Sequence, residues 1–312
     1  MHTLILDHRN IRLEYDNKCL IIRQDDTKPR SIPLQHLSKI VCLHNVDLTT
    51  SLLGQLWKRG IDFVTLNSRH ADCSFGLYAN QQQQVERRCR QYAWQQHEST
   101  ALALARTLCE HRIRLNLRLL KTDTPSPLLQ QQLEQALTRI PEATNLASLR
   151  GLEGAAQRLM FAHWRTQLPA SLGFERRQRR PPKDPVNSLL SLTSSLLLQD
   201  AVRECTAAGL DPYLGFYHRT VSGRHSLACD LLETLRPKLE QWVMQLFINK
   251  QFDRRYFTGL EQPDSPCFLG KAGRELYYPL LQKMLPTWQR QLRATARWLC
   301  QHIDQSQEVL TA

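Results

Sequence analysis

The sequence predicts an α+β protein, with a small β-rich domain at residues 1–85 followed by a larger all-α domain at residues 86–312. The first 80 residues contain short, partly alternating apolar runs separated by polar turns, which is typical of strands. From residue 81 the chain is rich in Leu, Arg and Gln and has no Gly up to residue 139, as expected of long helices. A chain of 312 residues is also long enough for about two domains.

Six apolar runs in the N-terminal part are predicted to be strands. Polar pairs at 16–17 and 25–26 indicate turns between some of them. The runs lie at 4–6, 11–15, 19–22, 32–33, 39–43 and 61–66.

One short amphipathic helix is predicted between the last two of these runs. Thr49 and Thr50 precede its apolar stripe, and Gly60 follows where a helix C-cap belongs. Together with the strands, such a helix forms a small module in which it covers one face of a sheet. The stripe consists of Leu52, Leu53, Leu56 and Trp57.

The rest of the chain is predicted to be helical as far as about residue 300. A break at 121–127 separates two long helices, and a further helix is expected to begin near Leu149. Beyond it, prolines are expected to interrupt the helices. They are Pro181, Pro182, Pro185, Pro212, Pro237, Pro263, Pro266 and Pro286.

The composition argues against a secreted or membrane-spanning protein. The sequence has neither a signal-peptide pattern at its start nor an apolar run of about 18 residues. Its nine cysteines are scattered and include no C-x-x-C pair, which argues against a disulfide framework or a thiolate zinc site. We therefore expect a cytoplasmic protein with reduced thiols.

The charge distribution favours a polyanionic partner. The formal net charge is +12, of which +2 falls in residues 1–80 and +10 in residues 81–312. A pI of about 9.5 is in the range of nucleic-acid-binding domains. Solubility alone is the alternative explanation of this excess.

Glu153 is a candidate functional residue because it lies between Gly151 and Gly154, at the head of an apolar helix. Each Gly in a helix costs about 1 kcal/mol against Ala, so a packing or access reason is expected. Small neighbours would let a ligand, a backbone or a metal approach the carboxylate. The alternative is a solvated first-turn Glu that the helix dipole favours.

Two further segments carry candidate residues. His218 ends the run 209–218, in which an Asp-Pro turn and a Gly precede two aromatic residues. Asp230 and Glu233 are three residues apart in 226–237, so both project from one face of a helix. Two such carboxylates raise each other's pKa unless a cation lies between them, and that cation could be Arg236 or a divalent metal. Carboxylates with one imidazole suit Mg²⁺ or Mn²⁺.

A basic run precedes the proline-rich segment at 181–185. Closely spaced cations of this kind suit DNA phosphates, although the run could be only a solvated loop. We predict that nucleic acid is bound by Arg176, Arg177, Arg179, Arg180 and Lys183.

The order of these motifs is more specific than any one of them. They run R-G-L-E-G-A-A, R-R-P-P-K-D-P-V-N-S-L-L-S, G-L-D-P-Y-L-G-F-Y-H and S-L-A-C-D-L-L-E-T-L-R-P. In this order the chain resembles the CRISPR-associated integrase/endonuclease family, the metal-dependent subunits of the CRISPR adaptation complex. The N-terminal stretches I-P-L-Q-H-L-S-K-I-V and R-G-I-D-F-V are similar to the β-domain of that family. The resemblance spans roughly residues 1–300.

The resemblance implies a Mg²⁺ or Mn²⁺ site formed by Glu153, His218 and Glu233, which are then the catalytic residues. Asp230, one turn away, is implied as a supporting carboxylate. Some family members carry Asp at the position of Glu233, which leaves open whether Asp230 or Glu233 is the direct ligand.

The resemblance also implies a reaction and partners. A prespacer 3′-hydroxyl would attack a phosphodiester of the CRISPR repeat and release the repeat strand's 3′-OH, and water as the nucleophile would give cleavage. The implied partners are prespacer and leader-repeat DNA, a second copy of the chain joined through the β-domain, and a small ferredoxin-like second adaptation protein. The alternatives are a non-catalytic DNA-binding scaffold and a general structure-selective nuclease.

Overall fold

The computed structural model describes residues 2–25, 27–67, 73–79, 84–123, 126–179, 181–260 and 265–305. The chain divides into two compact units, one comprising residues 1–84 with 206–209 and the other residues 85–205 with 210–312. The first is rich in strands and the second is mostly helical, which confirms the predicted α+β class. Within the described ranges, no helix is long and apolar enough to span a membrane. The dimerisation role of the N-terminal part stays a prediction.

Two four-stranded sheets form the N-terminal unit. In the first sheet, β1, β5 and β7 pair in parallel and β7 pairs with β8 antiparallel. Each run predicted as a strand overlaps a strand of these sheets. The first sheet consists of β1 (His2–Leu6), β5 (Leu37–Cys42), β7 (Asp62–Thr65) and β8 (Phe75–Leu77). The second consists of β4 (Arg30–Pro33), β3 (Cys19–Gln24), β2 (Ile11–Asp16) and β6 (Val46–Leu48).

The predicted helix of this unit is α1 (Thr50–Lys58). Its N-cap is Thr49, whose side chain accepts a hydrogen bond from the backbone N–H of Leu52 at 3.3 Å. Leu52 and Leu56 are fully buried in a core that also takes side chains from both sheets. Trp57, in contrast to the predicted stripe, keeps 46% of its surface exposed.

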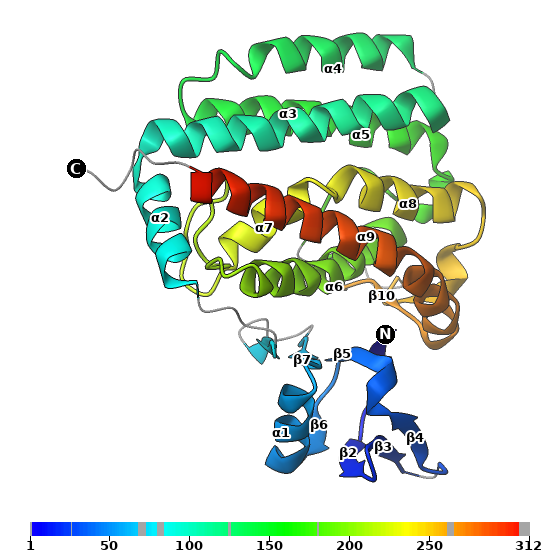
Figure 1. Cartoon of the computed structure of the whole chain (residues 1–312). Helices are drawn as coiled ribbons and strands as arrows, with labels where there is room; N and C mark the ends of the chain where they lie inside the picture. Colours follow the sequence, from blue (N-terminus) through cyan, green and yellow to red (C-terminus); the bar gives the residue numbers. More distant parts are fainter. Residues whose placement is uncertain are drawn as a thin grey trace. The chain divides into compact units, whose positions relative to one another are not determined.

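Eight α-helices of the described chain follow the N-terminal sheets (Figure 1). They are joined by loops, short 3₁₀ turns and one small hairpin of β9 (Phe257–Thr258) and β10 (Phe268–Leu269). The helices are α2 (Val85–Gln96), α3 (Glu98–Asp123), α4 (Pro127–Arg139), α5 (Leu146–Gln167), α6 (Pro185–Ala207), α7 (Ser226–Glu233), α8 (Arg236–Ile248) and α9 (Lys271–Gln305).

Helix α3 is central to the helical unit. It packs against α2, α4, α5, α7 and α8, and Figure 1 shows it running beside α4 and α5. Helix α6 is joined to α9 by polar contacts, including a 2.6 Å hydrogen bond between the hydroxyls of Thr193 and Tyr277. The side chains that α3, α5, α7 and α8 direct toward one another can therefore meet in the interior.

The prolines act in two different ways. Pro185 and Pro237 lie in the first turns of α6 and α8, where a missing N–H removes no helical hydrogen bond. Pro286 was predicted to interrupt a helix, but α9 runs on through Pro279 and Pro286 for 35 residues. Buried side chains on both sides of Pro286, including Trp288, keep the helix packed, which offsets the lost hydrogen bond.

Leu13→Ala should destabilise the N-terminal unit by about 2–5 kcal/mol, because Leu13 is completely buried in β2 and its loss leaves a cavity. Hydrogen–deuterium exchange followed by mass spectrometry should show faster exchange in peptides of both sheets. Arg12→Ala is the matched control, since the neighbouring side chain on the same strand is 65% exposed. Equal exchange in the two variants would contradict the proposed core.

Candidate functional site

Glu153 lies about two turns inside α5, which begins at Leu146 rather than near Leu149. The helix begins at a capping box in which the Asn145 side chain accepts a 2.9 Å hydrogen bond from the backbone N–H of Ser148. Glu153 is therefore not a first-turn residue, and its side chain is only 14% exposed. The alternative of a solvated glutamate at the helix dipole is wrong.

The two glycines beside Glu153 do not serve packing within the described chain. A Cβ atom at Gly151 would meet none of its atoms within 4 Å, and one at Gly154 would touch only the Arg158 guanidinium at 3.7 Å. Gly154 instead lines an open pocket that Glu153 also lines. Of the two predicted reasons for glycine here, access to the carboxylate fits and internal packing does not.

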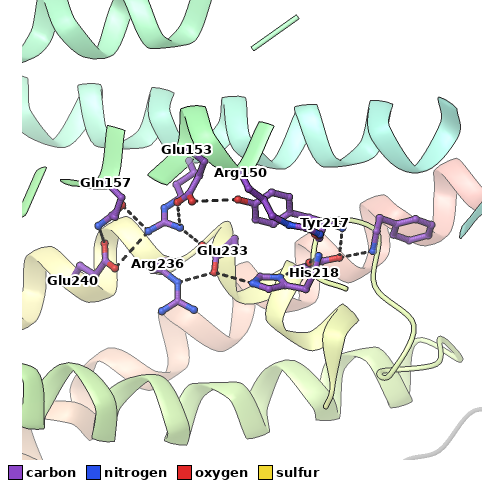
Figure 2. Close-up of polar contacts among 11 residues, drawn as sticks. Arg150, Glu153, Gln157, Tyr217, His218, Glu233, Arg236 and Glu240 are labelled. Atoms are coloured by element: carbon purple, nitrogen blue, oxygen red, sulfur yellow. Dashed lines mark hydrogen bonds and ion pairs between the residues drawn. The ribbon is translucent and has the colours of Figure 1, made fainter. Parts of the chain in front are cut away.

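Asp230 fixes the segment that carries His218. Its carboxylate accepts backbone N–H bonds from Phe216, Tyr217 and His218 at 2.6, 3.0 and 2.9 Å. One of its oxygens also lies 2.6 Å from Nδ1 of the His218 ring. With Nδ1 engaged, Nε2 faces Glu233 at 3.9 Å (Figure 2). Asp230 is 1% exposed and lies behind His218 as its support.

Gly215 is what allows this segment to approach Asp230. A Cβ atom at Gly215 would lie 2.7 Å from the backbone of Ser226 and 2.9 Å from the Asp230 carboxylate. Both distances are shorter than real Cβ contacts, so any other residue would push the loop away from α7. The glycine in the G-F-Y-H motif is therefore a packing requirement of the His218 loop.

Glu233, the last residue of α7, is a buried carboxylate held by two arginines. Arg236 Nε donates to its Oε1 at 2.8 Å, and Nη1 of Arg112 forms a close hydrogen bond to its Oε2. Burial raises the pKa of Glu233, but these two guanidinium groups outweigh it and lower the pKa to about 2. Glu233 is thus a carboxylate anion at neutral pH.

Arg112, on α3, joins the two candidate carboxylates. Its Nη1 contacts Glu153 Oε1 at 2.5 Å as well as Glu233, and its Nη2 donates to Gln157 Oε1 at 2.6 Å. A third carboxylate, Glu240 on α8, lies 3.6 Å from Nη2. Burial lowers the pKa of Arg112, but the carboxylates of Glu233 and Glu153 hold it above the ordinary value. This arginine is fully charged and buried among acids.

Arg112 is not among the site residues predicted from the sequence, although the sequence carries a signal for it. The residue follows the apolar positions of α3 at helical spacing, four residues after Leu108 and next to Ile113. A cation on the buried face of a helix calls for an acidic partner. The helical pattern does not predict which acidic residue pairs with Arg112, because Glu233 lies 121 residues away in sequence.

A pocket of about 910 Å³ opens over these residues. Tyr217 connects its parts, since its hydroxyl donates to Glu153 Oε2 at 3.2 Å and its backbone carbonyl accepts from Arg150 at 2.5 Å (Figure 2). A pocket lined by arginines could bind a polyanion, and the carboxylates of Glu153, Glu233 and Glu240 in the same lining could bind a cation beside it. The arginines lining it are Arg112, Arg150, Arg158, Arg165, Arg176, Arg177 and Arg179.

The predicted phosphate-binding residues separate into different environments. Arg176 and Arg179 are exposed and line the pocket, whereas Lys183 is exposed but does not line it. Arg177 points partly inward, where Nη1 donates to Asn187 Oδ1 at 2.8 Å and Nη2 to Ser191 Oγ at 3.2 Å. Arg180 lies outside the described residues.

Asn187, completely buried near the start of α6, organises this loop. Besides accepting from Arg177, its Oδ1 accepts from the backbone N–H of Gln178 at 2.8 Å. Its Nδ2 donates to the carbonyl of Arg176 at 2.8 Å and to Asp184 Oδ2 at 2.6 Å. The arginine-rich segment is therefore held in a defined shape.

The candidate ligands fit a divalent cation in their chemistry. Two carboxylates and the Nε2 of His218 are donors that suit Mg²⁺ or Mn²⁺. As they stand, no three acidic, His or Cys side chains in the described part of the chain are gathered closely enough to hold an ion. Arg112 Nη1 lies between the carboxylates of Glu153 and Glu233, so the positive charge between them comes from a guanidinium group.

The model of the family "CRISPR associated protein Cas1" matches residues 4–283. A CRISPR-associated endonuclease Cas1 from Thermodesulfovibrio yellowstonii is 32% identical over 319 residues, covering 97% of this chain and 99% of that protein. Among solved structures, a casposase bound to its integration product superposes with a TM-score of 0.84 at 18% identity, covering 99% of this chain and 92% of that one.

A second solved structure, a Cas6-RT-Cas1–Cas2 complex, superposes with a TM-score of 0.81 at 23% identity. The match covers 97% of this chain and 35% of that longer chain. At these identities, both structural matches show a shared fold.

Glu233→Gln should destabilise the helical unit by about 3–5 kcal/mol at neutral pH, because Arg112 and Arg236 lose a buried partner. The folded-state pKa of about 2 lies below the ordinary 4.5, so the carboxylate stabilises above pH 4.5 and that stabilisation is lost as the pH falls toward 2. Urea denaturation followed by circular dichroism should therefore show the difference from wild type shrinking over this range.

The control is Glu175→Gln, a pocket carboxylate that is 70% exposed in its pair with Arg165. It should change the free energy of unfolding by less than about 0.5 kcal/mol at any pH. A Glu233→Gln difference that stays constant with pH would contradict the ion pairing described above.

Proposed function

The chain belongs to the CRISPR-associated Cas1 family, and from that premise we propose that it is a metal-dependent DNA endonuclease and integrase of CRISPR adaptation. One observation carries the proposal. Glu153 and Glu233 both contact Nη1 of Arg112, and Nε2 of His218 lies 3.9 Å from the Oε1 of Glu233, so side chains from three separate segments gather in the lining of an arginine-rich pocket. An ion at that position and a phosphate backbone in the pocket would be neighbours.

Glu153, Glu233 and the Nε2 of His218 would hold Mg²⁺ or Mn²⁺. The bound ion would neutralise the charge that develops on the oxygens of the scissile phosphate. Asp230 keeps Nδ1 of His218 hydrogen-bonded, which leaves Nε2 free to face the pocket. We therefore assign Glu233 as the direct ligand and Asp230 as the residue that orients His218.

The proposed reaction is an in-line exchange of phosphodiester bonds. The 3′-hydroxyl oxygen of a prespacer forms a bond to phosphorus, the bond from that phosphorus to the repeat strand's 3′-oxygen breaks, and this oxygen leaves with a proton. Water in place of the hydroxyl gives hydrolysis. Arg176 and Arg179, exposed at the pocket, would bind flanking phosphates and keep the DNA in place.

The proposed partners are leader-repeat DNA, a second copy of the chain and the small second adaptation protein. The similarity to a Cas6-RT-Cas1–Cas2 complex supports assembly with a Cas2-type partner. All nine cysteines are free thiols, which supports a reducing compartment such as the cytoplasm.

Glu153→Gln should reduce strand joining by about 100-fold or more, because it removes one charged ligand while keeping the side chain's volume. The assay joins a labelled oligonucleotide to a supercoiled plasmid bearing a leader and repeat, with the second adaptation protein and Mg²⁺ or Mn²⁺. Glu175→Gln is the matched control in the same pocket and should retain activity within about twofold.

Joining by Glu153→Gln at the wild-type rate would overturn the site assignment. Cleavage by the wild-type protein without any joining to the repeat would instead support a general nuclease.

Arg176→Ala should weaken DNA binding and reduce the slope of log affinity against log salt concentration by about 1, without changing thermal stability. Arg177→Ala should destabilise the helical unit by about 1.5–3 kcal/mol, because its guanidinium makes internal hydrogen bonds to Asn187 and Ser191. Fluorescence anisotropy over a salt series and thermal unfolding measure the two effects. If Arg177→Ala unfolded like wild type, the structural role of Arg177 would be wrong.

A further inference from the structure

Arg112 places its Nη1 between the two carboxylates that the proposed function gives to the metal ion. Its Nη1 lies 2.5 Å from Glu153 Oε1 and is also hydrogen-bonded to Glu233 Oε2. An Mg²⁺ ion binds carboxylate oxygens at roughly 2.0–2.1 Å. The nitrogen and the ion cannot lie between the same two oxygens, so binding of the ion requires the guanidinium to move.

A second position for the guanidinium already exists beside the first. Nη2 of Arg112 donates to Gln157 Oε1 at 2.6 Å, and Gln157 Nε2 donates to Glu240 Oε2 at 2.9 Å. Figure 2 shows Gln157 and Glu240 together on the side away from His218. The same Nη2 lies 3.6 Å from Glu240 Oε1, within ion-pair range but too far for a hydrogen bond.

Glu240 and Arg112 each have unused capacity for a closer pair. Glu240 is 3% exposed, and burial raises its pKa although Arg112 lowers it. The Nε of Arg112 is buried and has no hydrogen-bond partner among the described residues. A shift of the guanidinium toward α8 would replace the 3.6 Å contact by a hydrogen-bonded ion pair and release Glu153 and Glu233 together.

We propose that Arg112 is an exchangeable internal cation of this site. Without a divalent ion its guanidinium neutralises Glu153 and Glu233, and when an ion binds it moves to Glu240 and Gln157. The proposal rests on the proposed function, since it takes Glu153, His218 and Glu233 as the ligands. Gln157 contacts both Arg112 and Glu240, so it guides the movement.

The exchange has two consequences. The metal-free site keeps its shape, because the carboxylates of Glu153 on α5 and Glu233 on α7 are never left facing one another without a cation. The ion binds more weakly than it would to an empty pair of carboxylates, because it has to displace a charge. If Arg112 had only a structural role and stayed in place, it would not compete with the ion, and its removal would not tighten ion binding.

The test measures Mn²⁺ binding to the full-length protein without DNA, from the electron paramagnetic resonance signal of free Mn²⁺. Arg112→Gln should bind Mn²⁺ about tenfold more tightly than wild type, and its thermal unfolding temperature without metal should fall. Arg236→Gln is the matched control, because it removes a buried cation that contacts the Oε1 of Glu233 rather than the Oε2 that Arg112 contacts. It should tighten binding less than Arg112→Gln does.

Glu240→Gln tests the second position and keeps the volume of the side chain. It should weaken Mn²⁺ binding about tenfold, because the displaced guanidinium has no anion to receive it. In the double variant Arg112→Gln/Glu240→Gln most of this loss should disappear, since there is no guanidinium left to move. If Arg112→Gln does not fold, as judged by circular dichroism, Glu240→Gln against wild type still tests the exchange.

Unchanged or weaker Mn²⁺ binding by Arg112→Gln overturns the exchange, as does an Mn²⁺ affinity of Glu240→Gln equal to that of wild type. A Glu240→Gln loss that persists in full in the double variant also overturns it, because the effect would then not act through Arg112. Glu153→Gln, measured beside these variants, separates the two proposals. If it binds Mn²⁺ like wild type, the ligand assignment itself fails.

Discussion

The helical unit is organised around the contact of one buried guanidinium with acidic side chains from three other helices. Arg112 reaches from α3 to Glu153 on α5, Glu233 on α7 and Glu240 on α8. Charges taken out of water at this depth are tolerated only when they are paired and hydrogen-bonded. The requirement to keep these charges together therefore constrains how the four helices pack, and it places two carboxylates within reach of one ion.

The second constraint is the fixed backbone around His218. Three consecutive N–H groups and the imidazole are bound by the single carboxylate of Asp230, and Gly215 permits the loop to approach α7 closely enough for this. The loop that carries His218 is thereby held in a defined conformation. Asp230 and Glu233, three residues apart on α7, consequently serve different purposes. The first orients the imidazole and the second faces the pocket.

The positive charge of the helical part also divides by position. Arg176 and Arg179 present their charge to the pocket, whereas Arg177 uses its guanidinium inside the loop, on Asn187 and Ser191. Arg177 therefore stabilises the shape of the segment, whereas Arg176 and Arg179 supply the positive charge of its surface. The count of basic residues alone describes neither function, because it treats all of these side chains as equivalent.

The sequence by itself determined the α+β class, through apolar periodicity, and its motifs made Glu153, His218, Asp230 and Glu233 candidate site residues. These are local patterns, since strand alternation, helix stripes and an i, i+3 carboxylate pair are visible within a few residues. The continuation of α9 through Pro286, the internal role of Arg177 and the contact of Arg112 with Glu233 were decided only by the tertiary structure. Each depends on partners from distant segments, and a buried charge finds its counter-charge only once the chain has folded.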